Sequence, residues 1–171
     1  AECLSQRSEG DKLWDQLATP INSVYFDSPK MSLYKERLAR IEGAQLLRAR
    51  WYGPSRPQGN ELIFLELKTH HEKWINSKSV KERVSIREKD MMKFLALDKW
   101  SIKDAEALVL AATPALDTKA LDKAADIMLR MHELVVWNKL RPCVRSVYLR
   151  AAFQSAKSNQ LRLTIDRSVA L

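Results

Sequence analysis

The sequence predicts an α+β fold: an antiparallel β-barrel around a polar interior, with covering helices and a helical insertion at about residues 88–140. Five segments carry this prediction, because each alternates between apolar and charged residues as a strand with two different faces does. The segment before the last two strands has helical periodicity instead. The 171 residues fit one domain, 1–171, with a sizeable core.

The first half of the chain is expected to be mostly strands. Residues 11–18 form a short amphipathic helix, and the alternating segment 23–27 ends at the turn Asp27-Ser28-Pro29. A short helical or irregular link follows and closes at Gly43. Strands are then predicted over 44–52, 61–69 and 79–87, with a turn-rich connection at 53–60 and a polar loop at 71–78.

The second half begins with helices and closes with strands. Helical segments are expected over 88–97, 102–112 and 117–139. Asp117 is the candidate N-cap of the last helix, and Pro142 ends it because proline cannot continue a helix. Strands over 143–151 and 161–166 complete one curved antiparallel sheet.

Composition excludes several classes of protein. No apolar run approaches the ~20 residues that a membrane span needs, and the first residues lack the apolar region of a signal peptide. Cys3 and Cys143 are too few and too far apart for a disulfide framework or a zinc site, so we expect two reduced thiols. The chain is therefore expected to be a soluble, globular domain.

Charge favours an anionic partner. The chain has 29 basic and 21 acidic residues, a net charge of +8. Nucleic acid, phosphorylated small molecules and a membrane surface all fit such an excess. Charge alone puts nucleic acid first, and the position of the charges has to decide.

The predicted strands each have one apolar and one charged face. On 44–52, Arg48 and Arg50 share a face while Leu47, Ala49 and Trp51 take the other. The charged faces of the other four strands carry Glu66 and Lys68; Ser79, Lys81, Arg83, Ser85 and Arg87; Ser146, Tyr148 and Arg150; and Arg162, Thr164 and Asp166.

A sheet with one wet side would explain this alternation. Arginine and lysine nevertheless dominate the strand centres, and the opposite faces are strongly apolar, as if helices cover them. Desolvating unpaired cations is costly, so a cationic lumen needs an anion or water inside it. Polyphosphate or a nucleoside triphosphate suits such a lumen, because guanidinium groups bind phosphate oxygens bidentately.

Five strings resemble a known family: "SVYFD", "RLARIEGAQLLRARWYG", "ELKTHHEKW", "SVKER" and "LRPCVRSVYLRAAFQ". They are similar to the catalytic domain of the vacuolar transporter chaperone (VTC) polyphosphate polymerase, from about residue 21 to 169. This family belongs to the triphosphate tunnel metalloenzymes, whose fold is a barrel lined with basic residues and wrapped by helices. The resemblance thus implies the architecture that the alternation predicts.

The resemblance also implies an activity and a site. The enzyme would transfer the γ-phosphate of ATP onto a growing inorganic polyphosphate chain. The reaction would use a divalent metal, commonly Mn²⁺, with Mg²⁺ as the alternative. The implied catalytic residues are Arg48, Arg50, Lys68, Lys81, Arg150 and Arg162. Tyr148 also matches, and with Arg83 and Ser146 it forms the expected phosphate- or substrate-binding group. Phosphoryl transfer depends mainly on positioning and charge neutralisation, which such residues supply.

The chain departs from the family at its ends. A further tunnel lysine lies on a strand before "SVYFD" in the family, and a metal-binding glutamate lies on a strand after "TIDRSV". The domain therefore looks incomplete at both ends, and Glu66 and Asp166 are left as weak metal candidates. The implied setting is a membrane-embedded VTC complex with other subunits, at the cytosolic face of a vacuole or acidocalcisome membrane.

Two other functions remain open beside the polymerase: a tunnel-fold triphosphatase and a non-catalytic polyphosphate-binding subunit of the same complex. Joint retention of the six basic residues argues against the last. A nucleic-acid-binding module would need exposed aromatics among its cations, and here the aromatics fall mostly on helices or apolar faces, so no nucleic-acid partner is expected. His70, His71 and Glu72 indicate a polar loop rather than a metal site, and His132 a packed helical histidine.

Overall fold

A computed structural model describes residues 14, 16–72, 79–155 and 161–171. Of the helix expected over 11–18, residues 11–13 and 15 lie outside this range, and the amide of Ala18 donates to the carbonyl of Trp14 at 2.8 Å, as in a helical turn. The polar loop expected at 71–78 lies outside it from residue 73 onward. Cys3 also lies outside the described residues.

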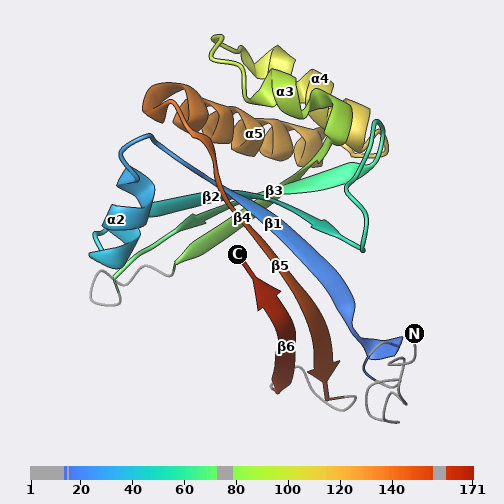
Figure 1. The fold of residues 1–171 in the computed structure, drawn as a ribbon. Coiled ribbons are helices and arrows are strands. Elements are labelled where there is room, and N and C mark those ends of the chain that lie inside the picture. Colours follow the sequence, from blue (N-terminus) through green and yellow to red (C-terminus); the bar gives the residue numbers. More distant parts are fainter. Residues whose placement is uncertain (1–13, 15, 73–78, 156–160) are drawn as a thin grey trace, which may run out of the picture.

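Six strands, the short helix α2 and a helical insertion are the main elements of the described chain (Figure 1). In order, the elements are β1 (Thr19–Asp27), α2 (Ser32–Leu38), β2 (Gln45–Tyr52), β3 (Leu62–Thr69), β4 (Val80–Arg87), the 3₁₀-helix η2 (Glu88–Asp90), α3 (Met91–Phe94), α4 (Ile102–Ala112), α5 (Thr118–Asn138), β5 (Arg141–Gln154) and β6 (Arg162–Ala170). All five strands predicted from alternation are strands, and the insertion at 88–140 is helical as predicted. The α+β class is confirmed.

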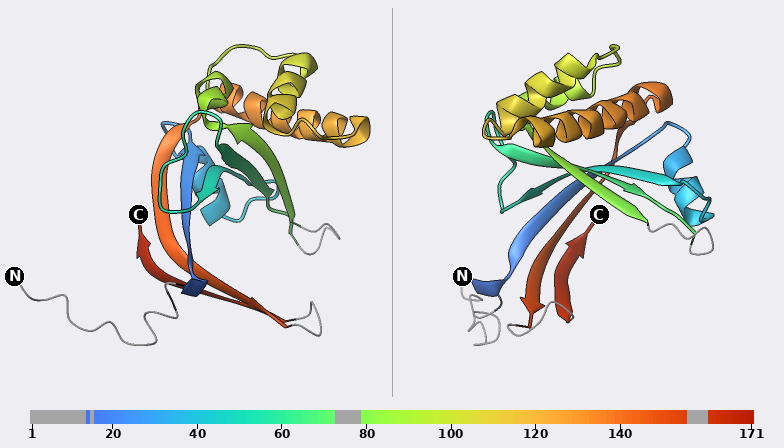
Figure 2. Two further views of the ribbon diagram at one scale, coloured as in Figure 1. Left: turned by 90° about the vertical axis from the view of Figure 1, so that its right-hand side faces the viewer. Right: turned by 180° about the vertical axis from the view of Figure 1, so that it is seen from behind.

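The strands form one antiparallel sheet in the order β4-β3-β2-β1-β5-β6. The helical insertion carries the chain from the edge strand β4 back to β1, where β5 pairs. Residues far apart in sequence, such as Ser23 and Ser146, are therefore direct partners. The sheet is strongly curved, with α3, α4 and α5 packed on its outer side (Figure 2).

The barrel prediction needs one correction, because the sheet is not closed. Strands β4 and β6 are its two edges, and within the described residues they do not pair with each other. A small barrel with a ligand-sized interior usually has about eight strands, so six strands surround only part of such an interior. The site is consequently an open concave face rather than an enclosed tunnel.

The core lies between the apolar sheet face and the helices. Leu47, Leu65 and Ile86 are completely buried, as are Val109 and Met128 on α4 and α5. Asp117 caps α5 as predicted by accepting a hydrogen bond from the amide of Ala120 at 2.8 Å.

The helical cover stops short of β6. Leu163 and Ile165, on its expected apolar face, remain 55% and 43% exposed, so the expectation that helices cover every apolar face fails for β6. In the part of the chain that the structure describes, no helix combines the length and apolar character needed to cross a membrane.

Candidate functional site

A pocket of about 490 Å³ lies on the concave face, and every strand of the sheet contributes to it. We call it the cationic pocket; its lining residues are Tyr25, Arg48, Arg50, Lys68, Lys81, Ser146, Tyr148, Arg150, Asp166, Val169 and Leu171. Seven of the nine residues predicted to act in catalysis or substrate binding line it, all except Arg83 and Arg162. Alternation places their side chains on this face, and the strand register brings them together.

The register sets charged and hydroxyl side chains in rows across the sheet. One row runs from Tyr25 on β1 through Arg48 and Glu66 to Arg83 on β4. Lys68 and Lys81 are direct partners in the next row. Like charges placed opposite each other repel, so this arrangement needs either buried counter-charge or a bound anion.

Glu66 supplies the counter-charge. Its side chain has no exposed surface, and four cations surround it. Arg48 donates to Oε2 from Nε at 2.8 Å and from Nη2 at 2.6 Å, and Arg50 Nη1 lies 3.8 Å from the same oxygen. Oε1 accepts from Arg83 Nε at 2.9 Å and lies 3.0 Å from Lys81 Nζ. Glu66 thus fixes the base of the pocket.

This carboxylate stays ionised although it is buried. Burial raises the pKa of Glu66, but hydrogen bonds from Arg83, Arg48 and Lys81 outweigh that effect and lower the pKa to about 2. At neutral pH, the negative charge of Glu66 holds three side chains from two strands, Arg48, Lys81 and Arg83, in fixed directions. The cations around Glu66 are therefore preorganised, and because one carboxylate faces four of them, their net charge stays positive.

Positive charge remains in excess around the pocket. Two carboxylates, Glu66 and Asp166, face six cations, namely Arg48, Arg50, Lys68, Lys81, Arg83 and Arg150. Lys68 shows the effect, because burial and the nearby charges of Arg48 and Lys81 lower its pKa. Such a concentration of like charge in a partly desolvated pocket attracts anions.

Hydroxyl groups complete the polar lining. Arg50 donates to Ser23 Oγ at 3.0 Å and to Tyr148 Oη at 3.2 Å, and Arg48 donates to Tyr25 Oη at 3.2 Å. Ser146 differs, since it is 6% exposed and its Oγ has no hydrogen-bond partner among the described residues. A buried hydroxyl of this kind is costly unless a ligand or water bonds to it, so Ser146 Oγ is free to bond to either within the pocket.

The remaining predicted basic residues lie beside the pocket. Arg83 extends from the edge strand β4 to Glu66 and to Tyr52 Oη, 3.1 Å away. Arg162 lines an adjoining pocket of about 530 Å³, with Leu17, Thr19, Ile21, Arg50, Tyr52, Arg150, Ala152, Phe153, Gln154 and Thr164. Arg50 and Arg150 line both pockets, so the two lie side by side.

The two candidate metal ligands, Glu66 and Asp166, differ in how accessible their oxygens are to a metal ion. Each oxygen of Glu66 already accepts from at least two arginine or lysine nitrogens, and the side chain has no exposed surface, which makes it a poor metal ligand. Among the described residues, Asp166 is the carboxylate that lines the cationic pocket, and its side chain is 34% exposed. Arg150 donates one hydrogen bond to each of its oxygens, at 2.6 and 2.7 Å, and that hydrogen bonding lowers its pKa. No group of three His, Cys, Asp or Glu side chains suited to a metal exists among the described residues. Mg²⁺-type ions are often held by one or two carboxylates plus substrate phosphates, a pattern that Asp166 fits.

The histidines lie apart from this site. His70 is 3.3 Å from Glu72, and His71 bonds to Glu42, so both belong to a polar loop as predicted. His132 is packed, 1% exposed, and its two ring nitrogens lie 2.9 and 2.7 Å from the carbonyl oxygens of Phe94 and Asp98. None of the three lines the cationic pocket.

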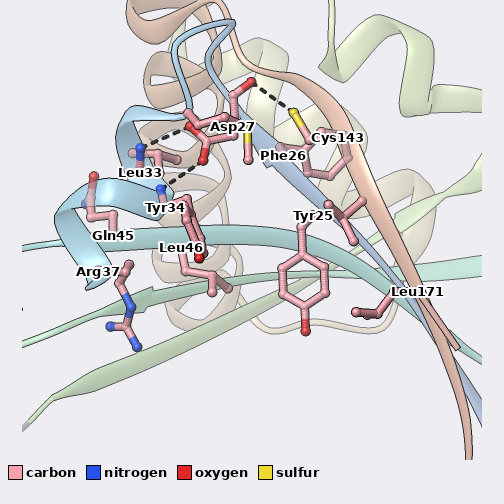
Figure 3. Close-up of a pocket in the computed structure, with 12 residues that line it drawn as sticks. Tyr25, Phe26, Asp27, Leu33, Tyr34, Arg37, Gln45, Leu46, Cys143 and Leu171 are labelled. Carbon is pink, nitrogen blue, oxygen red and sulfur yellow. Dashed lines mark hydrogen bonds between the residues drawn. The ribbon is translucent and has the colours of Figure 1, made fainter. Parts of the chain in front are cut away.

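A third pocket, of about 330 Å³, is almost entirely apolar (Figure 3). It lies between β1, α2 and the start of β5 and shares Tyr25 and Leu171 with the cationic pocket. Its carboxylate, Asp27, already accepts hydrogen bonds from the amides of Leu33 and Tyr34 at 3.0 and 2.8 Å. This pocket offers little to an anion, so the concave face is the better candidate site.

Sequence reasoning missed three contributors. Ser23 and Tyr25 alternate within "SVYFD" and could have been placed on the charged face by the same rule as the arginines. The counter-ion role of Glu66 needed the register, because it depends on Arg48 and Arg83 lying directly opposite it.

Comparison with known proteins identifies the family. The profile of the VTC domain family matches residues 3–171, so the chain belongs to that family. A vacuolar transporter chaperone complex subunit 4 from Trypanosoma brucei brucei is 37% identical over 158 residues, which cover 88% of this chain and 19% of that protein. The subunit 4 from Schizosaccharomyces pombe is 33% identical (88% of this chain, 20% of that protein), and a subunit 2 from Saccharomyces cerevisiae is 29% identical (87% and 18%).

The chain therefore spans about a fifth of the length of these relatives. Among solved structures, a candidate adenylate cyclase from Bacillus halodurans superposes with a TM-score of 0.49 at 14% identity, covering 98% of this chain and 71% of that one. A TM-score of this size supports no argument about function.

Proposed function

We propose that this domain is a polyphosphate polymerase, which transfers the γ-phosphate of ATP onto a growing inorganic polyphosphate chain bound along the concave face. The observation that carries the proposal is the cationic pocket itself, where preorganised arginines and lysines from four strands converge around one buried carboxylate. Membership of the VTC family and the sequence motifs that resemble its polymerase support the same conclusion.

The reaction needs little side-chain proton chemistry. The bond from the γ-phosphorus to the β–γ bridging oxygen breaks, a terminal oxygen of the polyphosphate chain takes its place, and ADP leaves with the bonding electrons. Charge spreads over the equatorial phosphate oxygens in the transition state. Donors already fixed in place can stabilise that charge without reorganising, which is the largest contribution in many enzymes.

The roles of individual residues follow from their contacts. Arg48 is held by Glu66, and Arg50 by Ser23 and Tyr148, so both guanidinium planes are fixed before substrate arrives. Lys68 forms no hydrogen bond or ion pair among the residues described, which leaves its ammonium group available for phosphate oxygens. Glu66 is a positioning residue in this account, because it lies beneath the pocket and acts through Arg48, Lys81 and Arg83.

A divalent metal, Mn²⁺ or Mg²⁺, is proposed to enter with the triphosphate. When bound, it would neutralise charge on the phosphate oxygens. Asp166 is the residue we propose to hold it, because its carboxylate lines the pocket. Arg150, which binds Asp166, is placed to hold a phosphate and the carboxylate side by side.

The biological setting is likewise a proposal. The relatives are named as subunits of the vacuolar transporter chaperone complex, so we infer that this chain works with other subunits of a membrane-embedded complex. The proposed location is the cytosolic face of a vacuole or acidocalcisome membrane. ATP and polyphosphate, rather than nucleic acid, are the proposed ligands of the concave face.

Product analysis tests the proposal. Purified protein is incubated with ATP and Mn²⁺, and products are resolved by gel electrophoresis and ³¹P NMR. Long polyphosphate supports a polymerase, whereas phosphate released without polymer identifies a triphosphatase. Polyphosphate binding without turnover identifies a non-catalytic subunit. Arg50→Ala serves as the site variant, and Arg130→Ala, which removes one positive charge from α5 on the other side of the sheet, serves as the matched control.

A further inference from the structure

The apolar pocket between β1, α2 and the start of β5 suits an apolar occupant (Figure 3). Phe26, Leu33 and Leu46 are among the side chains that line it. Its carboxylate, Asp27, already accepts from the amides of Leu33 and Tyr34, and from that of Ser28 at 2.7 Å. A peptide backbone in this pocket would bring amide and carbonyl groups that need partners, whereas an acyl chain brings none.

Unpaired cations lie on and beside α2. They are Lys30, Lys35, Arg37 and Arg40, and among the described residues none of these four side chains forms an ion pair or a hydrogen bond. Arg37 also lines the apolar pocket. The same stretch, residues 28–46, holds two carboxylates, Glu36 and Glu42, and Glu42 is already bonded to His71. Several unpaired cations close together attract a negatively charged partner.

Exposed apolar side chains extend outward from the pocket along α2. Tyr34, Leu38 and Ile41 are 57%, 71% and 52% exposed. Tyr34 and Leu38, four residues apart, share one side of the helix. Ile41 follows the helix, and its amide donates to the carbonyl of Glu36 at 3.0 Å, as in a Schellman motif, which holds it near the last turn of α2. One molecule bound in the pocket would leave Leu38 and Ile41 in water, whereas a bilayer surface would cover them.

We propose that α2 and the apolar pocket beside it form a docking surface for an anionic lipid bilayer. Leu38 and Ile41 enter the boundary between headgroups and acyl chains, the ring of Tyr34 lies at headgroup level, and the pocket takes one acyl chain. The four cations contact the anionic headgroups. This inference goes beyond the proposed function, because it concerns α2 and does not depend on what the concave face binds.

Vesicle flotation tests the docking surface. Purified protein is mixed with vesicles of phosphatidylcholine alone, or of phosphatidylcholine with about one-third phosphatidylserine, and the bound fraction is measured. The unaltered protein should bind the phosphatidylserine vesicles about ten-fold more tightly or better. Combining Leu38→Gln with Ile41→Gln should weaken that binding by about ten-fold, and Lys35→Gln should weaken it by about three-fold. These side chains are exposed, so the variants should fold.

Two matched controls lie elsewhere on the molecule. Leu163→Gln makes the same kind of apolar-to-polar change at a 55% exposed position of β6, and Lys68→Gln removes a positive charge from the cationic pocket. Both should keep the vesicle affinity within about two-fold. Equal losses in the α2 variants and the controls would overturn the proposal. So would an unaltered protein that prefers neither vesicle, which would leave an acidic protein surface or a second copy of the chain as the partner.

Alkylation of Cys143 tests whether an acyl chain enters the pocket. Cys143 lines the pocket and is exposed, so a thiol reagent can reach it in the free protein. Phosphatidylserine vesicles should slow its alkylation, followed by mass spectrometry of the peptide that contains it, and should not slow it in the Leu38→Gln, Ile41→Gln variant. Vesicle binding with an unchanged alkylation rate would overturn the placement of an acyl chain in the pocket.

Discussion

Arg48 and Glu66 lie directly opposite each other on β2 and β3 and form a buried ion pair, with two guanidinium nitrogens 2.8 and 2.6 Å from one carboxylate oxygen. Their pairing makes a cluster of cations compatible with a folded sheet when no anion is bound. Arg48, Arg50 and Lys81, which surround Glu66, still line the cationic pocket. The stability of the domain and its capacity for anions are therefore linked through Glu66.

Glu66→Gln should destabilise the domain by about 3–5 kcal/mol, the cost of removing one partner of a buried ion pair. Arg48, Lys81 and Arg83 would then repel one another without a counter-charge. Tripolyphosphate should restore stability more in this variant than in the unaltered protein, because an anion replaces the lost charge. Urea denaturation with and without ligand measures both effects.

Glu82→Gln is the control for that experiment. Glu82 lies on β4 and pairs with Arg130 of α5 at 2.7 Å, away from the pocket. A partly exposed pair of this kind contributes about 1 kcal/mol or less. Equal losses in the two variants, or no rescue of Glu66→Gln by tripolyphosphate, would contradict the counter-ion role.

Acid should weaken the domain through Glu66. Its pKa in the folded protein, about 2, lies below its ordinary value of 4.5, so ionised Glu66 stabilises the fold above about pH 4.5. That contribution, about 3 kcal/mol, is lost as the pH falls from 4.5 toward 2. The difference in unfolding free energy between the unaltered protein and Glu66→Gln should therefore shrink over this range. A difference that stays constant down to pH 3 would show that Glu66 is not the titrating group.

Arg50→Ala should abolish turnover and leave the fold intact. Glu66 keeps three other cations, and removing one of several crowded positive charges relieves repulsion in the empty pocket. The loss in transition-state stabilisation should be about 3–4 kcal/mol, similar to losing one preorganised oxyanion donor. Arg50→Lys should also be poor, because an ammonium group cannot reproduce the bidentate fork. Assays of polyphosphate formed from ATP, with melting temperatures, test this.

Ala49→Asp should have the opposite effect. Ala49 is 3% exposed and points into the core beneath the helices, so a carboxylate there would be buried without a partner. We expect unfolding or a large fall in melting temperature. If Arg50→Ala unfolds the protein while Ala49→Asp is harmless, the two faces of β2 have been assigned the wrong way round.

Lys68→Met should separate binding from stability. Burial and two neighbouring cations lower the pKa of Lys68, so its charge costs the empty protein stability. Removing the charge should raise the melting temperature without ligand and weaken tripolyphosphate binding by about ten-fold or more, as for a lost charge-assisted hydrogen bond. A variant that loses stability and keeps its affinity would exclude Lys68 from the phosphate site.

The positions of the predicted strands, and the face on which their charged residues lie, could be predicted from the sequence alone. Alternation is a local property, so it placed Arg48, Arg50 and Lys81 correctly without any knowledge of pairing. The question it could not answer was why arginines are tolerated inside. The answer is Glu66, whose partners lie 18 and 17 residues away and meet it through strand register.

Two other features depend on long-range structure. The sheet stays open because β4 and β6 are its two edges and do not pair among the described residues. Alternation within a strand does not show how many strands surround the concave face or whether the sheet closes. The division of the basic residues between two pockets depends on β5 pairing with β1 across the helical insertion. Neither feature can be read from the alternation of residues within one strand.

Ligand-induced stabilisation tests most directly the claim that the concave face binds a phosphate chain. The unfolding free energy is measured with and without tripolyphosphate, for the unaltered protein and for Lys68→Met. At 100 times its Kd, tripolyphosphate should stabilise the unaltered protein by about 2.7 kcal/mol, and at the same concentration it should stabilise Lys68→Met clearly less. No stabilisation of the unaltered protein, or equal stabilisation of both, would contradict the account.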